Sequence, residues 1–548
     1  MTDFNRHPDT YRHWHLELDA PIAWLTLAVD PQDCFAEGYE LKLNSYDLGV
    51  DIELRDVTER LRFEHPEIRT VVMTGGLDGV FCAGANIRML AGSTHGHKVN
   101  FCKFTNETRN AIENASAHSG QRYLAALNGA ASGGGYELAL ACDHILLVDD
   151  RNSAVSLPEV PMLGVLPGTG GLTRVTDKRG VRRDLADVFA TRAEGSRGEE
   201  AVRWGLVDEL APRSTWEQSV RDRALAMAAG SDRPTNAVGV LLPPVEPEAD
   251  DTTLTYRWVR AQLHRDQRFV ELIVTGPDGP PPDTPDDVDA ASWLVACARQ
   301  LDDLLLHLRF DETELGTIVL RTEGDLDLLV AHDEFLAEHG DHWLMRETSL
   351  LWGRVFKRLD LTARSLIAVI EPGSCFGGLA LELALAADRS YMLDGIFEDD
   401  DEPAPAAELA ITASNLGPLP MSNGLSRLAS RFWGDAKALD AVGELVGHRL
   451  DTASALVHGL VTFAPDDLDW ADEVRLAIEE RASFSPDALT GMEANHRFVG
   501  PETVETKIFA RLTAWQNWIF QRPNAAGPDG ALRRYGSGSR PSYDYSRV

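Results

Sequence analysis

Residues Leu127–Asp143 read LNGAASGGGYELALACD, and this stretch decides the fold class. The apolar run Leu124–Leu127 predicts a strand that ends at Asn128-Gly129. The glycines Gly133–Gly135 are followed by helix formers, and Ile145–Val148 is again strand-like. Strands and helices therefore alternate, which predicts an α/β fold with at least partly parallel strands.

The chain of 548 residues repeats itself. ELALACD at Glu137–Asp143 matches ELALAAD at Glu382–Asp388, a shift of 245 positions. LRFEHPEIRTVVM at Leu61–Met73 matches LRFDETELGTIVL at Leu308–Leu320, a shift of 247. Matches in the same order at nearly constant shift indicate two copies of one unit of roughly 240 residues.

Composition places the boundaries of these copies. We predict a catalytic domain at 1–235, a Pro- and Asp/Glu-rich linker at 236–253, a second domain at 254–521 and an arm-like tail at 522–548. The second copy is expected to be an inactive scaffold. At the shift of 245, Leu379 takes the place of Gly134. A third match, LPGTGGLTRV at Leu166–Val175 with LPMSNGLSRL at Leu419–Leu428, has a shift of 253, and at that shift Thr412 takes the place of Glu159.

Overall charge limits the partners. The formal net charge is −34, which argues against nucleic acid and anionic membrane surfaces but leaves an anionic small molecule possible. No apolar run is long enough for a membrane span, and the polar N-terminus has no apolar segment for export. The six cysteines form no C-x-x-C pair, so a zinc or thioredoxin-type site lacks support. We expect a soluble cytoplasmic protein.

Two glycine-rich loops could each present a backbone N–H. FCAGANI at Phe81–Ile87 follows the strand Thr70–Thr74, and Gly133–Gly135 precede a helix, whose positive end favours anions. One N–H from each loop could stabilise a developing oxyanion.

A pair of carboxylates accompanies these loops. Glu137 lies on the first turn after the glycines, and Glu159 follows the next strand in SLPEV. If those strands are neighbours, both carboxylates project into one cleft, where one can take a proton while the other gives one. Burial and mutual repulsion could keep one of them protonated near neutral pH. No P-loop, G-x-S-x-G or H-E-x-x-H motif competes with this interpretation.

Taken together, these motifs resemble the crotonase superfamily. FCAGANI is similar to its F-x-A-G-A-D-I loop, and the glycine block and the PEVPMLGVLPGTGG stretch beginning at Pro158 resemble its two other motifs, in the same order. The resemblance implies a spiral of repeated ββα units, here duplicated, with helical C-terminal segments in each half. It also implies that Ala85 and Gly134 bind the thioester oxygen and that Glu137 and Glu159 are the acid/base pair.

Further site residues follow from the same resemblance. Asn86 replaces the usual Asp, and its neutral amide could orient a water or a substrate oxygen. Tyr136 stands where a small residue is common, and it either contacts substrate or packs against the helix. The resemblance implies a role in binding substrate or coenzyme A for five residues: Lys42, Asn44, Gly84, Gly133 and Tyr136.

The doubled length, Asn86 and the segment Lys42–Leu54 look like the ring-cleaving members of the superfamily. These imply a 2,3-epoxide of benzoyl-CoA as substrate, two waters consumed, and 3,4-dehydroadipyl-CoA semialdehyde and formate as products. We expect no metal, flavin or nicotinamide, because the step is not redox and coenzyme A is part of the substrate. The alternatives are an ordinary enoyl-CoA hydratase or isomerase and a non-catalytic CoA-ester binding subunit. A homodimer is expected.

Overall fold

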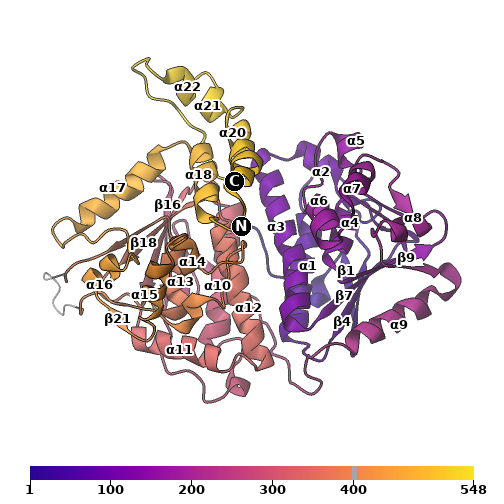
Figure 1. Ribbon diagram of the computed structural model, residues 1–548, viewed down its shortest axis with the longest axis horizontal. Coiled ribbons are helices and arrows are strands. Elements are labelled where there is room, and N and C mark those ends of the chain that lie inside the picture. Colours follow the sequence, from indigo (N-terminus) through magenta and orange to yellow (C-terminus); the bar gives the residue numbers. More distant parts are fainter. Residues whose placement is uncertain (398–403) are drawn as a thin grey trace. The chain divides into compact units, whose positions relative to one another are not determined.

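The computed structural model describes residues 1–397 and 404–548. It divides into two compact units. The N-terminal unit spans Asp3–Pro244, and the C-terminal unit comprises Val245–Val548 with Met1–Thr2. Each unit builds its own sheet and its own helices (Figure 1). Within the residues described, no helix is both long and apolar enough to cross a membrane.

The main sheet of the N-terminal unit confirms the α/β prediction. Its order is β1 (Trp14–Asp19), β2 (Ile22–Leu27), β4 (Thr70–Gly75), β7 (Arg122–Leu127), β9 (His144–Asp149) and β12 (Glu209–Pro212). Only β1 pairs antiparallel, and β2 through β12 are parallel. The strands are apolar and buried, as expected for a parallel sheet that is covered on both faces.

A second, smaller sheet branches from the main one. Its order is β11 (Ser196–Arg197), β10 (Ala154–Ser156), β8 (Gly129–Ser132) and β5 (Gly79–Cys82). Along the chain, β5 lies between β4 and α2 (Ile87–Gly92), β8 between β7 and α4 (Gly134–Ala141), and β10 between β9 and α5 (Glu159–Leu163). A β–β–α pattern thus recurs three times.

The sequence did not reveal strand β8. Asn128-Gly129 reads as the end of a strand, but the chain bends there and forms a second one. The Asn128 amide bridges to Gly75, donating to its oxygen at 2.7 Å and accepting from its nitrogen at 3.1 Å. These bonds fix the bend and direct β8 towards the small sheet.

Helices cover the main sheet. Helix α9 (Trp216–Ala228) packs Val220 and Ala224 onto the buried face formed by β2, β4, β7 and β9. Helix α1 (Leu48–Phe63) lies beside α3 (His95–Asn114), as Figure 1 shows. A buried ion pair joins them, with Arg109 Nη1 2.5 Å from Asp51 Oδ1.

The C-terminal unit has a seven-stranded sheet: β13 (Glu248–Ala249), β14 (Thr253–Thr255), β15 (Val259–His264), β16 (Phe269–Thr275), β17 (Thr317–Glu323), β18 (Ser365–Ile370) and β19 (Arg389–Met392). Strands β16 to β19 are parallel. Helix α10 (Trp293–Phe310) precedes β17 as α1 precedes β4, and α13 (Gly378–Ala386) follows β18 as α4 follows β7 and β8. These elements therefore follow the same order in the two units.

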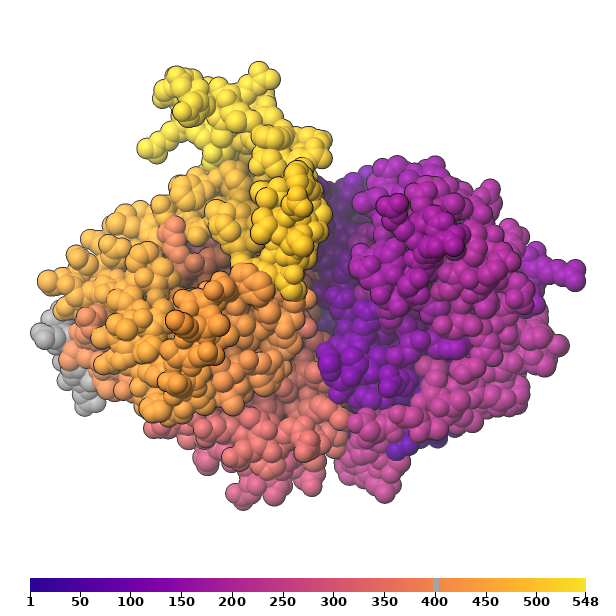
Figure 2. Space-filling view, in the orientation of Figure 1, coloured from indigo at the N-terminus to yellow at the C-terminus, as the bar shows by residue number. Residues whose placement is uncertain are grey.

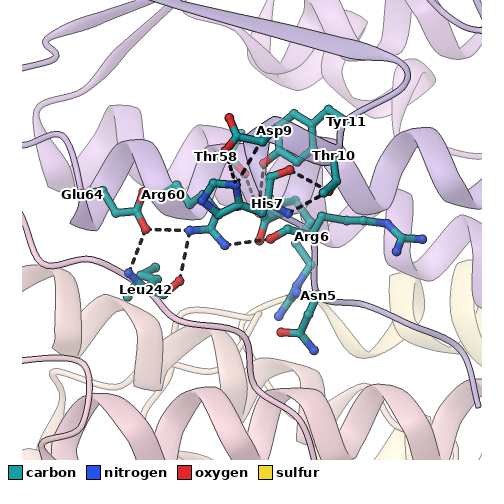
Figure 3. Close-up of polar contacts among 12 residues, drawn as sticks. Asn5, Arg6, His7, Asp9, Thr10, Tyr11, Thr58, Arg60, Glu64 and Leu242 are labelled. Carbon is teal, nitrogen blue, oxygen red and sulfur yellow. Dashed lines mark hydrogen bonds and ion pairs between the residues drawn. The ribbon is translucent and has the colours of Figure 1, made fainter.

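The segment predicted as a free linker is partly bound to the N-terminal unit. Arg60 on α1 donates to Glu64 at 2.7 Å, to the Leu242 carbonyl at 3.0 Å and to the Arg6 carbonyl at 2.7 Å (Figure 3). Val240 N also donates to Phe63 O at 2.8 Å. Arg60 thereby holds the N-terminal arm and Leu242 to the same helix, and the division between the units, after Pro244, falls inside the predicted linker 236–253.

The predicted arm-like tail also differs in the structure. It forms α21 (Pro523–Ala526) and α22 (Ala531–Arg534), which belong to the yellow part of the chain in Figure 2. Its end then returns to the core of the C-terminal unit. The Arg547 side chain, 2% exposed, lies 2.6 Å from Glu493 and 3.1 Å from Thr490 Oγ1. This buried ion pair fixes the end of the tail to the C-terminal unit, although the composition of the tail suggested an extended segment.

Candidate active site

The small parallel sheet brings the predicted site residues together. Strands β5, β8 and β10 are neighbours, and the chain leaves them at Gly84-Ala85, Gly133-Gly134 and Glu159 respectively. Parallel strands present their carboxyl ends at one edge, where ligands bind in α/β proteins.

The two glycine-rich loops meet at Gly84. This residue has φ +87°, and a β-carbon built on it would lie 2.8 Å from Gly134 N and 2.7 Å from Ser132 O. Only glycine allows both the backbone angle and the approach. The loop that carries Ala85 is therefore held against the start of α4, as an oxyanion site formed from two N–H groups requires.

Glu137 lies on the first turn of α4 with its side chain 98% buried from solvent. Its Oε1 accepts from Thr169 N at 3.0 Å and from Gly171 N at 2.7 Å, and its Oε2 accepts from the Thr169 hydroxyl. Three donors fix the orientation of the carboxylate.

A buried arginine supports the turn that holds Glu137. Arg174 Nη1 donates to Thr169 O at 2.8 Å, and its other nitrogens bind Glu113 at 2.9 Å and Asn110 at 2.7 Å. These bonds hold the Thr169–Gly171 backbone in the position from which its N–H groups donate to Glu137. Arg174 therefore positions the carboxylate without touching it.

Glu159 begins α5 and lies in a different environment. Its Oε2 is buried without a hydrogen-bond partner among the residues described, and its Oε1 lies beside Gly133. Burial, followed by repulsion from Glu137, raises the pKa of Glu159 to about 7, although its own N–H acts in the opposite direction. One carboxylate is thus fixed as an acceptor while the other can exchange a proton near neutral pH.

A pocket of about 230 Å³ opens beside Ala85. Lys42 and Arg88 place two cations at it, and Lys42 Nζ is 2.9 Å from Glu40. Exposed cations at a pocket suit a phosphorylated ligand. The lining residues are Glu40, Lys42, Ser45, Ala83, Ala85, Asn86, Ile87 and Arg88.

The side-chain amides of two predicted polar residues are engaged in hydrogen bonds to the backbone, although Asn86 also lines the pocket. Asn86 caps α2 by accepting from Met89 N at 3.0 Å, and its amide donates to Glu40 O at 2.8 Å. Asn44, 1% exposed, donates to Leu27 O at 2.8 Å and Phe81 O at 3.1 Å. Both amides are occupied, so the geometry favours supporting roles over the predicted contacts with water or coenzyme A.

Tyr136 packs rather than facing the site. It is fully buried, its hydroxyl donates to Leu206 O at 2.7 Å, and its ring meets Phe189 edge to face at 5.6 Å between centroids. Of the two roles left open for Tyr136, the structure favours packing.

Sequence reasoning missed four residues near this site: Tyr46, Cys102, Thr169 and Arg174. Thr169 lies inside the PGTGG stretch, and its hydroxyl between glycines was the available signal. Cys102 Sγ lies 3.4 Å from the position of a β-carbon on Gly168, and burial, with repulsion from Glu137, raises its thiol pKa to about 11. Nothing in the spacing pointed to Tyr46 or Cys102.

The C-terminal unit places different chemistry at the corresponding positions. Glu382, 1% exposed, accepts from Asn415 and from Arg427 Nη1, both at 2.8 Å, and Arg427 also binds Asp360 at 2.6 Å. Burial, outweighing the attraction of Arg427, raises the pKa of Glu382. This carboxylate is enclosed in an ion-pair network rather than presented to a ligand.

A carboxylate also fills the position of the second oxyanion loop in that unit. Gly378 has φ +45°, as Gly133 has φ +53°, and a β-carbon on Gly378 would lie 2.5 Å from the carboxyl carbon of Asp333. Burial raises the pKa of Asp333 to about 6, although Thr412, Ser414 and the Leu379 N–H lower it. Asp333, from α11 (Leu326–Glu338), occupies space that an oxyanion site would need free.

Comparisons with known proteins identify the family of the chain. The model of the enoyl-CoA hydratase/isomerase family matches residues 41–271. The benzoyl-CoA-dihydrodiol lyase of Aromatoleum evansii is 53% identical over 555 residues, covering 100% of this chain and 98% of that protein. The fatty acid oxidation complex subunit alpha of Aliivibrio fischeri is 31% identical over 38% of this chain and 28% of that protein. A solved enoyl-CoA hydratase from Geobacillus kaustophilus is 31% identical, with a TM-score of 0.35 over 40% of this chain and 75% of that one.

Proposed function

The chain belongs to the benzoyl-CoA-dihydrodiol lyase family, and we propose that it cleaves the ring of 2,3-epoxy-2,3-dihydrobenzoyl-CoA in aerobic benzoyl-CoA degradation. Two waters enter, and 3,4-dehydroadipyl-CoA semialdehyde and formate leave. The observation that carries the proposal is the 53% identity to such a lyase over the whole chain. The site supports it, because it joins two glycine-rich loops and two glutamates that lie in different environments.

The thioester oxygen accepts from the N–H groups of Ala85 and Gly134 in this proposal. Gly84 fits between the loops, so both donors are held before substrate arrives. Such preorganised donors make the ring electron-poor, and loss of one costs about 10²–10³ in rate.

The two glutamates take opposite roles. Glu137, held by three donors, accepts a proton from the attacking water. Glu159, with a pKa of about 7, carries a proton at neutral pH and gives it to the oxygen that leaves carbon. The second water then completes the release of the one-carbon fragment as formate. The reaction is hydrolytic throughout, and we propose that it uses no cofactor.

Coenzyme A binds through its phosphates at Lys42 and Arg88. Both side chains reach the pocket next to Ala85, where the acyl group would begin. The pairing of Lys42 with Glu40 limits its mobility and leaves donors for the ligand.

The remaining features follow the repeat. We propose that the three β–β–α segments form the spiral typical of crotonases and that the C-terminal unit is a duplicated, inactive copy. We propose a homodimer in the cytoplasm, and exposed apolar side chains are candidates for the contact between its subunits. They are Val160, Met162, Val165 and Leu166 near the site, and Val504, Phe509 and Phe520 in the C-terminal unit.

The deciding experiment measures formate released from enzymatically generated 2,3-epoxybenzoyl-CoA, with crotonyl-CoA hydration as the comparison. One formate per substrate with no crotonyl-CoA hydration supports the proposal. Hydration of crotonyl-CoA without formate would favour an ordinary enoyl-CoA hydratase. Tight CoA-ester binding without turnover of either would favour a binding subunit.

A further inference from the structure

Tyr46 carries a buried hydroxyl that the described part of the chain does not satisfy. The residue is 3% exposed, and its Oη has no hydrogen-bond partner among the described residues. Other buried tyrosines of this unit have one: Tyr136 donates to Leu206 O at 2.7 Å, and Tyr123 donates to Gln121 at 2.9 Å. An unpaired buried hydroxyl is costly, so its retention points to a partner that arrives with a ligand.

The position of Tyr46 joins both halves of the proposed oxyanion site. Its strand β3 (Ser45–Tyr46) pairs with β6 (Gly84–Ala85), which sets Tyr46 opposite Ala85. Its hydroxyl lies against Gly134, where any β-carbon would overlap Oη. The free O–H is therefore next to the two residues whose N–H groups would bind the thioester oxygen.

The ring is held so that the hydroxyl stays there. The Arg109 guanidinium lies 5.2 Å from the ring centroid, and the Phe101 ring lies 6.0 Å away. Arg109 is itself fixed by the buried Asp51 at 2.5 Å. Burial raises the pKa of Tyr46 well above its usual value, so the group remains a neutral donor at every working pH.

The chemistry of the substrate indicates which atom accepts from this donor. With the thioester oxygen between Ala85 and Gly134, the next acceptor along an oxygenated benzoyl-CoA is the oxygen on ring carbon 2, beside the ring carbon that bears the thioester. Benzoyl-CoA itself has none, and binding it would leave the hydroxyl unpaired. A site built to bind a substrate oxygen disfavours the analogue that lacks it.

We propose that the Tyr46 hydroxyl donates a hydrogen bond to the oxygen on ring carbon 2, beside the ring carbon that bears the thioester, making Tyr46 a specificity-determining residue for oxygenated benzoyl-CoA esters. This inference rests on the proposed function. No proton is transferred from Tyr46; it orients the oxygen that Glu159 protonates.

The test is calorimetric titration of the full chain with two stable probes, 2-hydroxybenzoyl-CoA and benzoyl-CoA. Tyr46→Phe should weaken 2-hydroxybenzoyl-CoA about 3- to 10-fold, the contribution of one hydrogen bond, and change benzoyl-CoA less than about 2-fold. The matched control is Tyr136→Phe, which removes a paired buried hydroxyl and should change neither affinity.

Stability gives an independent readout. Tyr46→Phe removes an unpaired group, so its thermal midpoint should equal or exceed that of the wild type, whereas Tyr136→Phe should lower the midpoint. If Tyr46→Phe weakens the affinity for both probes by the same factor, so that the ratio of the two affinities is unchanged, the inference is overturned. A wild type that binds neither probe overturns the proposed function as well, so the two failures are distinguishable.

Discussion

The carboxyl group of Glu159 lies over the backbone of Gly133, so close that a β-carbon there would stand 2.5 Å from Oε1. A larger residue at Gly133 would displace the acid from the site. The same closeness keeps water from the carboxyl group, and burial is the first cause of its raised pKa. The glycine loop thus contributes to the burial that raises the pKa of Glu159.

Stability should depend on pH through Glu159. Its pKa is about 7 in the folded protein and 4.5 without the fold, so the folded state binds more protons between these values. Stability is therefore lost as pH rises from about 4.5 to about 7. Glu159→Gln, which cannot ionise, should match the wild type at pH 5 and exceed it at pH 8 in urea unfolding. Glu199→Gln, at an exposed position, should show no such crossover.

Activity should fall above pH 7 if Glu159 gives the proton. The fraction that carries a proton declines through its pKa of about 7, and kcat should decline with it. Single-turnover rates from pH 5.5 to 9 would show the inflection. A rate that instead rises through pH 7 would reverse the roles of the two glutamates.

The hydroxyl of Thr169 should matter for the chemical step more than for binding. It is one of three donors to Glu137. Thr169→Val removes that donor at nearly constant volume and should lower kcat about 10- to 100-fold with KM little changed. Thr169→Ser retains the hydroxyl and should keep most of the activity. A large rise in KM for Thr169→Val would place the residue in substrate binding instead.

Glu137 and Glu382 occupy equivalent positions of the repeat, and their Gln variants should behave differently. Glu137→Gln should lower turnover by about 10²–10⁴ while CoA-ester affinity stays largely intact. Glu382→Gln should leave turnover unchanged and lower stability, because it weakens a buried network with Arg427. Steady-state kinetics beside thermal unfolding separates these outcomes. Loss of turnover in a folded Glu382→Gln protein would show that the second unit is not inactive.

The last residues should stabilise the C-terminal unit. Arg547→Ala leaves Glu493 buried without one of its cations and should reduce the free energy of unfolding by about 3 kcal/mol. Arg540→Ala, an exposed change in the same tail, is the control and should have little effect. Equal stability of the two variants in urea titrations would mean that the tail is as loose as its composition suggests.

Much of this molecule could be predicted from local patterns. Alternating strand and helix signals around Leu127–Asp143 predicted the α/β class. Such signals are local, because a buried strand appears as a short apolar run and the start of a helix can be recognised from the glycines before it. The motifs at Ala85, Gly134, Glu137 and Glu159 could be found for the same reason. Strand β8 could not be predicted in this way. The bend that precedes it depends on a hydrogen bond from the Asn128 side chain to Gly75, which lies 53 positions earlier in the sequence.

The sequence by itself located the internal matches, the two glutamates and the glycine-rich loops, because each depends on residue identity and short spacing. Only the tertiary structure decided that Asn86 caps a helix, that Arg174 holds the turn at Glu137, and that Arg547 is buried. It also placed Tyr46 against Gly134 and left its hydroxyl without a partner among the described residues. These outcomes depend on which distant groups reach a given polar atom, and burial, which sets the cost of leaving it unpaired, is a property of the whole fold.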